Sequence, residues 1–580
     1  MIAQTMRLSA SRLATRGLGI RPALAVTVTS RPHGRFLSLS SSRLQNTPVD
    51  EDFPHHSPAI TTTTPILETL QAARRRGRYS KKSRTTDLNN NYTPPLDAVP
   101  GSASSHSPLT HADISSLSTF LKCHNQLAKN IHDTCSQFGA AHRWGPGENE
   151  TGMNRLALTD ADKAARDWFV KEARGLGCEV EVDEMGNIWA IRGGVSDSRP
   201  TEDGSGKMLP PVMMGSHLDT QPRGGRYDGV LGVMAGLEAL RVLKERDIKT
   251  WRPVGVVCWT NEEGARFPVS MVSSGVWAGE IPLEKAHSLK EVAGEGKTMM
   301  EELERIGYLG DKKCSYEEMP MAAHFELHIE QGPVLEARGK KVGVVRGSQA
   351  YKWFTVEVVG KEAHTGTTPY AQRADAFMAA NSMIHYARWT GEEQDILVSV
   401  GVFQVFPGSV NTIPGRVKFS LDIRSSSTDK LAQFEERHLR PKFDSIAKNM
   451  GANSQPCSVT WQEDTNSPAQ LFDEGCCKAV KESALSVLAA ECDGNMEKAM
   501  GLVKYNMISG AGHDSVHTAK RCRTSMIFVP SKGGLSHHPE EFTSEEDCVR
   551  GAQVLLESVL RFDREVWRED YERERETAVE

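Results

Sequence analysis

The stretch PPVMMGSHLDTQPRGGRYDGVLGVMAGLEALRVLKER, residues 210–246, predicts the fold of the chain. Its first part is an apolar run that ends in a polar turn, which is the pattern of a buried strand. From Val230 onward, apolar residues recur at helical spacing at Val233, Leu237 and Leu240, so a helix with one buried face should follow. A strand, a polar turn and a helix in this order indicate one unit of an α/β sheet.

The same scheme occurs again along the chain. PVGVVCWTNEEG (253–264) and AAHFELHIEQG (322–332) are apolar runs that end in carboxylates and histidine. Active sites of open α/β sheets lie at the carboxyl ends of strands, so these polar residues stand where chemistry is expected. We therefore predict an α/β catalytic domain with a mixed central sheet flanked by helices, beginning at residue 113.

A smaller α+β domain is predicted to interrupt the catalytic domain between residues 342 and 455. Here the pattern changes to alternating strands with a helix between the first two; the strands are KWFTVEVVG (352–360), ILVSVGVFQVF (396–406) and GRVKFSLDIRS (415–425). The catalytic domain would then comprise 113–341 and 456–567, the second part opening with SVTWQEDT (458–465). Residues 568–580 are a run of charges and are predicted to be a solvated tail.

The composition argues against several classes of protein. A net charge of -6 is unlike that of a dedicated nucleic-acid binder. No apolar run approaches the roughly 18 residues needed to span a bilayer. The 11 cysteines include no CxxC pair, and Cys476 and Cys477 are adjacent, which favours reduced thiols over a disulfide framework or a cysteine zinc site. We expect neither nucleic acid nor a membrane as a partner.

The N-terminal region has two distinct compositions. Residues 1–49 contain seven arginines, many serines and no Asp, Glu or Lys, which is typical of a mitochondrial transit peptide; an untargeted tail of a cytoplasmic protein is the alternative. Residues 50–112 are rich in Thr, Ser, Pro and Asn with a basic cluster at 74–84, and are predicted to be a disordered linker.

Two candidate metal-binding groups flank the turn after the first strand. His217 and Asp219 lie two apart, so both can face one side; His217 is a candidate ligand, and Asp219 is expected to hold its other ring nitrogen. Asp228 follows glycines that allow a tight turn, and its carboxylate could bridge two metal ions roughly 3.5–4 Å apart. Taken alone, the His217 and Asp219 pair is better explained as a surface pair, and the alternative for Asp228 is an ordinary Asp in a Gly-rich turn.

Further ligands follow the later strands. Two adjacent carboxylates, Glu262 and Glu263, repel one another, and this costs free energy unless cations compensate the charge. Adjacent side chains also point in different directions. Glu263 is therefore a candidate ligand and Glu262 a candidate general base. His328 is the expected ligand of the second metal, and His537 supplies the last ligand, with His538 as the alternative.

Nitrogen and oxygen ligands without thiolate suit zinc. We expect two Zn²⁺ per subunit, with Mn²⁺, Co²⁺ or Ni²⁺ chemically acceptable. Glu541, four residues beyond His537, is a candidate for a supporting carboxylate.

Five segments together resemble one family over about residues 123–562: GSHLDTQPRGGRYDG, NEEGARF, HFELHIEQGP, GKEAHTGTTP and GLSHHPEE. They resemble the zinc-dependent aminoacylase/carboxypeptidase superfamily of hydrolases. His328 is typical of its carbamoyl amidohydrolase branch, which includes β-ureidopropionase (β-alanine synthase), N-carbamoyl-L-amino-acid hydrolase and allantoate amidohydrolase; peptidase and deacylase members have a carboxylate there. Within this branch the segments are most similar to the eukaryotic β-ureidopropionase form.

The resemblance implies roles for residues of the inserted domain, which would act as a lid. It implies that His364 stabilises the oxyanion of the tetrahedral intermediate, and that Asn411 and Arg424 hold the substrate carboxylate, for which an arginine fork is well suited. Gln331 would touch the carbamoyl group. Family members are homodimers through the smaller domain, so some of these groups could act across the interface. Two residues are expected to support the site: His513 and Asp514.

The function implied is hydrolysis of the carbamoyl group of an N-carbamoyl amino acid, foremost N-carbamoyl-β-alanine, to the amino acid, ammonia and carbon dioxide. This would place the protein in pyrimidine degradation. The alternatives are an allantoate amidohydrolase and a general N-carbamoyl-L-amino-acid hydrolase. His328 disfavours an N-acyl or peptide hydrolase. A binding protein that has lost its metals is disfavoured because no ligand or base position is missing.

Overall fold

The computed structural model describes residues 108–196, 209–449 and 454–577. The predicted transit peptide at 1–49 and residues 50–107 of the predicted linker at 50–112 lie outside these ranges, whereas residues 108–112 are described. Helix α1 (His111–His124) begins before the predicted start of the fold at residue 113, because Thr110 caps it. The Thr110 hydroxyl accepts the Asp113 amide at 3.1 Å, and the Asp113 carboxylate accepts the Thr110 amide at 2.8 Å.

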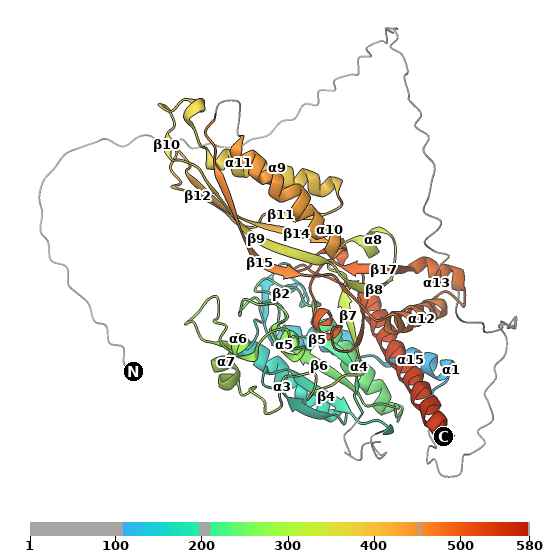
Figure 1. The fold of residues 1–580 in the computed structure, drawn as a ribbon. Helices are drawn as coiled ribbons and strands as arrows, with labels where there is room; N and C mark the ends of the chain where they lie inside the picture. Colours follow the sequence, from blue (N-terminus) through green and yellow to red (C-terminus); the bar gives the residue numbers. More distant parts are fainter. Residues whose placement is uncertain (1–107, 197–208, 450–453, 578–580) are drawn as a thin grey trace, which may run out of the picture. The chain divides into compact units, whose positions relative to one another are not determined.

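A nine-stranded mixed sheet forms the larger part of the structure, as predicted (Figure 1). Its order is β16-β8-β18-β7-β5-β6-β4-β3, with β17 beside β8. Strands β18, β7, β5 and β6 are parallel to their neighbours within this group, whereas β4, β3, β8 and β16 add antiparallel pairs. The bounds are β3 (Glu179–Val182), β4 (Ile188–Arg192), β5 (Val212–His217), β6 (Val254–Trp259), β7 (Ala323–Ile329), β8 (Val342–Ser348), β16 (Gln470–Leu471), β17 (Val503–Ser509) and β18 (Arg523–Val529).

Helices cover both faces of this sheet, which explains why β5, β6 and β7 are buried along their whole length. On one face of β7, Phe325 packs edge-on against Phe562 of α15. On the other face, Glu326 accepts a hydrogen bond from Ser515 of α14. The helices of this part are α1, α2 (Leu127–Gln137), α3 (Asp160–Gly175), α4 (Val230–Glu245), α5 (Val272–Trp277), α6 (Leu283–His287), α7 (Met299–Ile306), α8 (Val334–Ala337), α12 (Glu474–Glu491), α13 (Met496–Leu502), α14 (Asp514–Thr518) and α15 (Glu545–Thr577).

A second, antiparallel sheet has the order β11-β14-β9-β15, with β12 also on β14. Along β14, every second residue is apolar and buried, so one face of the sheet packs against helices α9 and α11 (Figure 1). Its elements are β9 (Ala350–Val359), α9 (Ala376–Glu393), β11 (Leu397–Ser399), β12 (Phe403–Phe406), β14 (Arg416–Ser425), α10 (Thr428–Gln433), the π-helical turn η3 (Phe434–Leu439), α11 (Arg440–Lys448) and β15 (Ser458–Ser467). This is the predicted inserted α+β domain.

The predicted limits of the inserted domain are wrong at both ends. Strand β8, which starts at Val342, pairs with β18 in the larger sheet. Strand β15 pairs with β9 along its length and so belongs to the smaller sheet, although we predicted that residues 458–465 resume the catalytic domain. An alternating pattern predicts a strand but does not say which sheet the strand joins.

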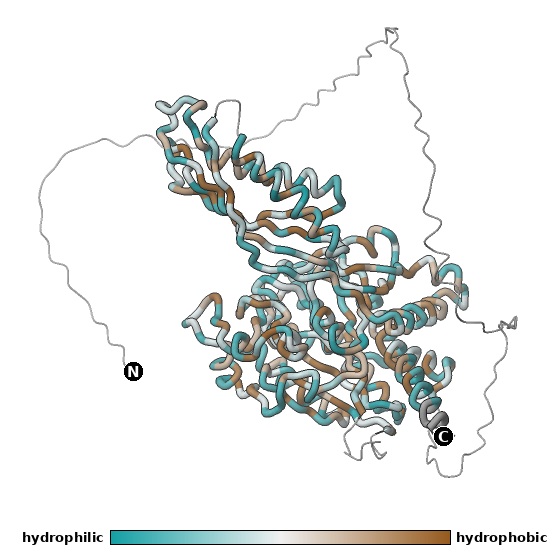
Figure 2. The backbone as a smooth tube through the Cα atoms, viewed as in Figure 1, coloured by the Kyte–Doolittle hydropathy of each residue, from teal (hydrophilic) through white to brown (hydrophobic). Residues whose placement is uncertain are grey.

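Helix α15 continues to Thr577 through the described part of the predicted solvated tail, where Arg568, Glu569 and Glu572 are exposed and Asp570 is half-buried. The Asp570 carboxylate accepts a hydrogen bond from the Trp251 indole at 2.9 Å and lies 3.2 Å from the Arg252 guanidinium. Figure 2 shows hydrophobic and hydrophilic positions alternating along α15, as expected for a helix with one buried face.

The structure also bears on the state of the cysteines and on membrane-spanning helices. All 11 cysteines lie in described residues and are free thiols, most of them buried. Within the described ranges, no helix combines the length and apolar character needed to cross a membrane.

Candidate metal centre

The parallel strands bring the predicted ligands to one edge of the larger sheet. His217 ends β5, Glu263 follows β6 and His328 lies near the end of β7, so the three side chains start from neighbouring positions. Asp228 lies in the turn before α4. Gly229 closes that turn with a φ of +67°, and a Cβ there would lie 2.3 Å from the His217 ring, so only glycine fits.

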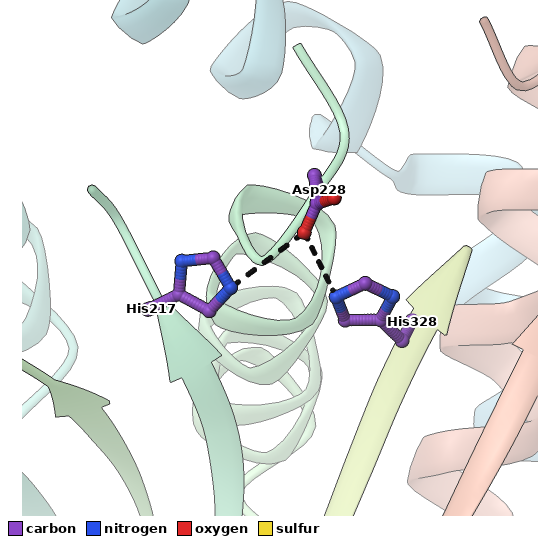
Figure 3. Close-up of side chains that lie close together, drawn as sticks. All are labelled: His217, Asp228 and His328. Atoms are coloured by element: carbon purple, nitrogen blue, oxygen red, sulfur yellow. Dashed lines mark ion pairs between the residues drawn. The ribbon is translucent and has the colours of Figure 1, made fainter. Parts of the chain in front are cut away.

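Asp228 stands between two groups of potential ligands. Its Oδ1 lies 3.7 Å from Nε2 of His217 and 3.1 Å from Nε2 of His328 (Figure 3). Its Oδ2 lies 3.6 Å from Nε2 of His537, which in turn is 3.3 Å from the Glu263 carboxylate. Each group offers three ligand atoms within 4.8 Å of one another. The geometry therefore places one carboxylate where it could bridge two ions.

Hydrogen bonds hold the two buried imidazoles with Nε2 toward Asp228. Nδ1 of His217 donates to the Asp219 carbonyl at 2.9 Å, and Nδ1 of His328 donates to the Ile329 carbonyl at 2.8 Å. We predicted that the Asp219 carboxylate would hold His217, but it lies 4.0 Å from Nδ1. The carboxylate instead accepts the backbone amides of Glu262 and Glu263, at 3.4 and 3.3 Å, and so positions the turn after β6.

The electrostatics of the centre are dominated by buried carboxylates. Burial alone would lower the pKa of His328, but the Asp228 carboxylate outweighs it and raises the value to about 9. A hydrogen bond to Glu263 raises the pKa of His537 to about 9. Burial raises the pKa of Glu262 well above its usual range, and the charges of Asp514 and Glu263 add to this effect.

The donor set fits divalent metal ions. Imidazole nitrogens and carboxylate oxygens converge without a thiolate, which suits zinc. Several buried carboxylates within one site are stabilised when cations lie between them. Glu262 takes part in neither Asp228-centred group, and its carboxylate faces the pocket with Oε2 3.5 Å from Nε2 of His217.

A pocket of about 210 Å³ opens onto these residues. Two of the predicted substrate-binding residues line it, Gln331 and Arg424. The Gln331 amide donates to Oδ2 of Asp228 at 2.6 Å. Arg424, from β14 of the smaller sheet, donates to the Asp422 carboxylate and to the Gly510 carbonyl. His513, which we predicted to support the site, packs edge-on against the His328 ring with centroids 4.5 Å apart.

His364 and Asn411 do not line this pocket within the described chain. Both are exposed in the smaller domain, where the short strand β10 (Ala363–His364) pairs with β13 (Thr412–Ile413). The Asn411 carbonyl accepts the Thr365 amide, so the two predicted residues lie side by side. His538, the alternative to His537, is exposed, and its Nδ1 accepts the Glu540 amide instead of facing the centre.

Sequence reasoning missed several residues that shape the site. The Ser536 hydroxyl donates to Oδ2 of Asp228 at 2.7 Å, and the Gln221 amide donates to Glu263 at 2.8 Å. Both belong to the quoted motifs, so their nearness to ligands was a usable signal. The pocket walls formed by Met271, Tyr351 and Trp353 carried no such signal, since they read as ordinary apolar positions.

Comparisons with known proteins give a consistent result. The family described as peptidase family M20/M25/M40 matches residues 213–561. An N-carbamoyl-L-amino-acid amidohydrolase of Rhizobium meliloti is 39% identical over 411 residues, covering 70% of this chain and 91% of that protein. A ureidoglycolate hydrolase of Arabidopsis thaliana is 32% identical over 412 residues, covering 70% of this chain and 80% of that protein. A crystal structure of a hydantoinase/carbamoylase family amidase from Burkholderia multivorans matches with a TM-score of 0.65 and 39% identity, over 75% of this chain and 97% of that one.

Proposed function

The chain belongs to the peptidase family M20/M25/M40 and is a hydrolase of amide bonds, and from this premise we propose that it removes the carbamoyl group of N-carbamoyl amino acids. One observation carries the proposal: Asp228 joins two ligand groups beside a pocket that also presents Glu262 and Arg424. We further propose that His217 and His328 hold one zinc ion, Glu263 and His537 hold another, and Asp228 bridges them. These ions would supply the Lewis acidity that polarises the scissile carbonyl and acidifies the attacking water.

The chain's own residues would divide the remaining work. Glu262 faces the pocket without being part of either ligand group, so it can accept a proton from water and return it to the leaving nitrogen. Arg424 is half-buried at the pocket wall and offers a planar fork to the carboxylate of the substrate. The Gln331 amide, already beside Asp228, can bind the carbamoyl group.

The amino acid itself is the finer part of the proposal. We predicted N-carbamoyl-β-alanine from the sequence, and we keep it as the first substrate to test. The similarity to an N-carbamoyl-L-amino-acid amidohydrolase and to a ureidoglycolate hydrolase makes these two activities the second candidates. All of these substrates share a carbamoyl nitrogen and a nearby carboxylate, which are the two groups that Gln331 and Arg424 would bind.

Turnover by the full-length, zinc-loaded protein tests the function, measured as ammonia release for the carbamoyl substrates and as release of the free amino acid for the N-acetyl compound. The panel is N-carbamoyl-β-alanine, N-carbamoyl-L-α-amino acids, ureidoglycolate, allantoate and an N-acetyl amino acid. Turnover of any carbamoyl substrate with no turnover of the N-acetyl compound supports the proposal, and the preferred compound identifies the amino acid. Turnover of the N-acetyl compound alone, or of none with metal bound, contradicts it.

Glu262→Gln isolates the base, because the amide keeps the size of the side chain but accepts no proton. We expect kcat to fall by about 10²–10⁴-fold while metal content stays at the wild-type value. Metal content is measured by atomic spectroscopy and turnover by ammonia release. An active variant would show that another group acts as the base.

The assembly and location are proposals as well. Exposed apolar residues gather on α9 and β12 of the smaller domain, where Phe377 and Phe403 pack edge-on; this supports a homodimer through that domain. His364 and Asn411 would then reach the pocket of the partner subunit. Light scattering tests the dimer, and recovery of activity in mixed dimers of His364→Ala and Glu262→Gln tests the exchange. Import into mitochondria and pyrimidine degradation remain predictions, tested by localisation of the tagged full-length protein and by the substrate panel.

A further inference from the structure

A second polar pocket lies between the start of α1, helix α12 and the late part of α15. Its volume is about 220 Å³, and it shares no lining residue with the pocket at the metal centre. The lining residues are His111, Lys478, Ala479, Glu482, Arg561, Arg564, Glu565 and Arg568. Nothing in the reaction proposed above uses them, so their arrangement calls for a separate explanation.

The pocket carries an excess of positive charge. Arg561, Arg564 and Arg568 are spaced three and four residues apart, so they share one face of α15. Lys478 on α12 adds a fourth cation, against only the carboxylates of Glu482 and Glu565 in the lining. Three guanidinium groups at helical spacing repel one another, which is unfavourable unless an anion joins them.

Two of the arginines have buried donors without an acceptor. Nη1 of Arg564 and Nε of Arg561 are both buried and have no hydrogen-bond partner among the described residues. The other nitrogens of Arg561 are used, because Nη2 donates to Glu557 and Nη1 donates to Nδ1 of His111, each at 2.9 Å. Buried polar groups are normally hydrogen-bonded, so these two nitrogens are free to donate to an acceptor from outside the described chain.

The first turn of α1 adds to the same field. His111 is the first residue of this 14-residue helix, whose N-terminus favours negative charge. Burial, followed by the charges of Arg564 and Arg561, lowers the pKa of His111, with Glu482 acting in the opposite sense. His111 therefore faces the pocket as a neutral imidazole that a bound anion would make more basic.

We propose that this pocket is a binding site for a small oxyanion, namely the phosphate group of inorganic phosphate or of a small phosphate ester. With Glu557, which is paired with Arg561, the four cations exceed the nearby carboxylates by one, and no ion pair of Arg564 or Arg568 is found among the described residues. Guanidinium forks match the tetrahedral oxygens of a phosphate group. Pockets for drug-sized ligands are typically about 300–1,000 Å³, so a volume of about 220 Å³ favours a small ligand.

Calorimetric titration of the full-length protein tests the site. The probes are inorganic phosphate and glycerol 3-phosphate, with chloride at equal ionic strength as the control for screening. The titration is made in the Arg424→Ala background, so that the anion-binding arginine of the substrate pocket does not contribute. We expect one phosphate per chain, and at least tenfold weaker binding in Arg564→Gln and in Lys478→Gln. Arg437→Gln, which removes an exposed arginine of the smaller domain, is the matched control and should bind as the parent does.

The His111 ring gives a readout that a structural role of the arginines would not move. Its proton resonance should titrate at higher pH when phosphate is present, and this shift should be lost in Arg564→Gln. Tighter binding of glycerol 3-phosphate than of phosphate would identify an ester as the ligand, and the reverse would identify the free ion. Unchanged phosphate affinity in both pocket variants, or no phosphate bound by the parent, would overturn the proposal.

Discussion

At the scale of single residues, Asp228 is the one side chain that both ligand groups share. Its two oxygens face different histidines, so an amide at this position would keep the shape but lose one of the two acceptors. We expect Asp228→Asn to bind fewer than two zinc ions per chain and to lose at least about a hundredfold in kcat. Atomic spectroscopy and ammonia release measure the two effects.

Ser536→Ala is the control for that substitution. It removes a hydrogen bond to Oδ2 of Asp228 without removing a metal ligand. Metal content should therefore stay at two zinc ions per chain, and kcat should fall less than in Asp228→Asn. If Asp228→Asn bound two ions as tightly as the parent, the assignment of Asp228 as a bridge would be wrong.

Gly229 gives a second prediction at this scale. A methyl group there would lie within 2.3–2.5 Å of the His217 ring, so Gly229→Ala must displace either the ring or the turn. We expect weaker zinc binding together with a lower unfolding midpoint. Gly177→Ala is the matched control, since that glycine also has a positive φ but open space around its missing Cβ. Equal metal affinity in the two variants would show that the contact with His217 is unimportant.

Whether a site residue could be predicted from the sequence depends on whether a local pattern fixes its position. His217, His328 and Glu263 follow buried strands, so topology and chemistry together indicated that they meet. The role of Asp219 depended on whether its carbonyl or its carboxylate faces His217, which spacing does not decide. The pocket walls at Tyr351 and Trp353 come from another sheet, and no local pattern reveals such a long-range contact.

At the scale of elements, the end of α15 makes a contact that the sequence did not predict. A run of charges reads as solvated, yet Asp570 lies under the loop before β6 and accepts the Trp251 indole. Deleting residues 568–580 should lower the free energy of unfolding by about 1–3 kcal/mol, since a buried indole N–H loses its acceptor. Urea unfolding measures it, and deletion of 578–580 alone is the control.

Strand β15 shows the other limit at this scale. Its alternating pattern gave its type correctly, but its partner β9 lies about a hundred residues earlier in the chain. Pairing over that distance is decided by tertiary packing, so the sequence pattern does not determine the domain limit that we predicted at residue 455. The fully buried strands β5, β6 and β7 could be placed from the sequence because their flanking motifs repeat one scheme.

At the scale of the whole molecule, the stability should fall in mild acid for a reason that the fold makes visible. His517 of α14 and His324 of β7 are both buried, and burial lowers the pKa of each to about 4. A histidine whose folded pKa lies below its unfolded value of about 6.5 takes up its proton more readily in the unfolded chain. Its contribution to stability is therefore present at neutral pH and is lost as the pH falls from about 6.5 toward 4.

For His517 alone this loss amounts to about 2 kcal/mol at pH 5. The variant His517→Gln does not titrate in this range, so its stability should fall by about that much less than the stability of the parent between pH 7 and pH 5. Because both proteins share every other titrating group, the difference between their urea midpoints isolates this one ring. A difference that is the same at both pH values would mean that His517 is already protonated in the folded protein, and that the charge is compensated by Glu280, the carboxylate that acts to raise its pKa.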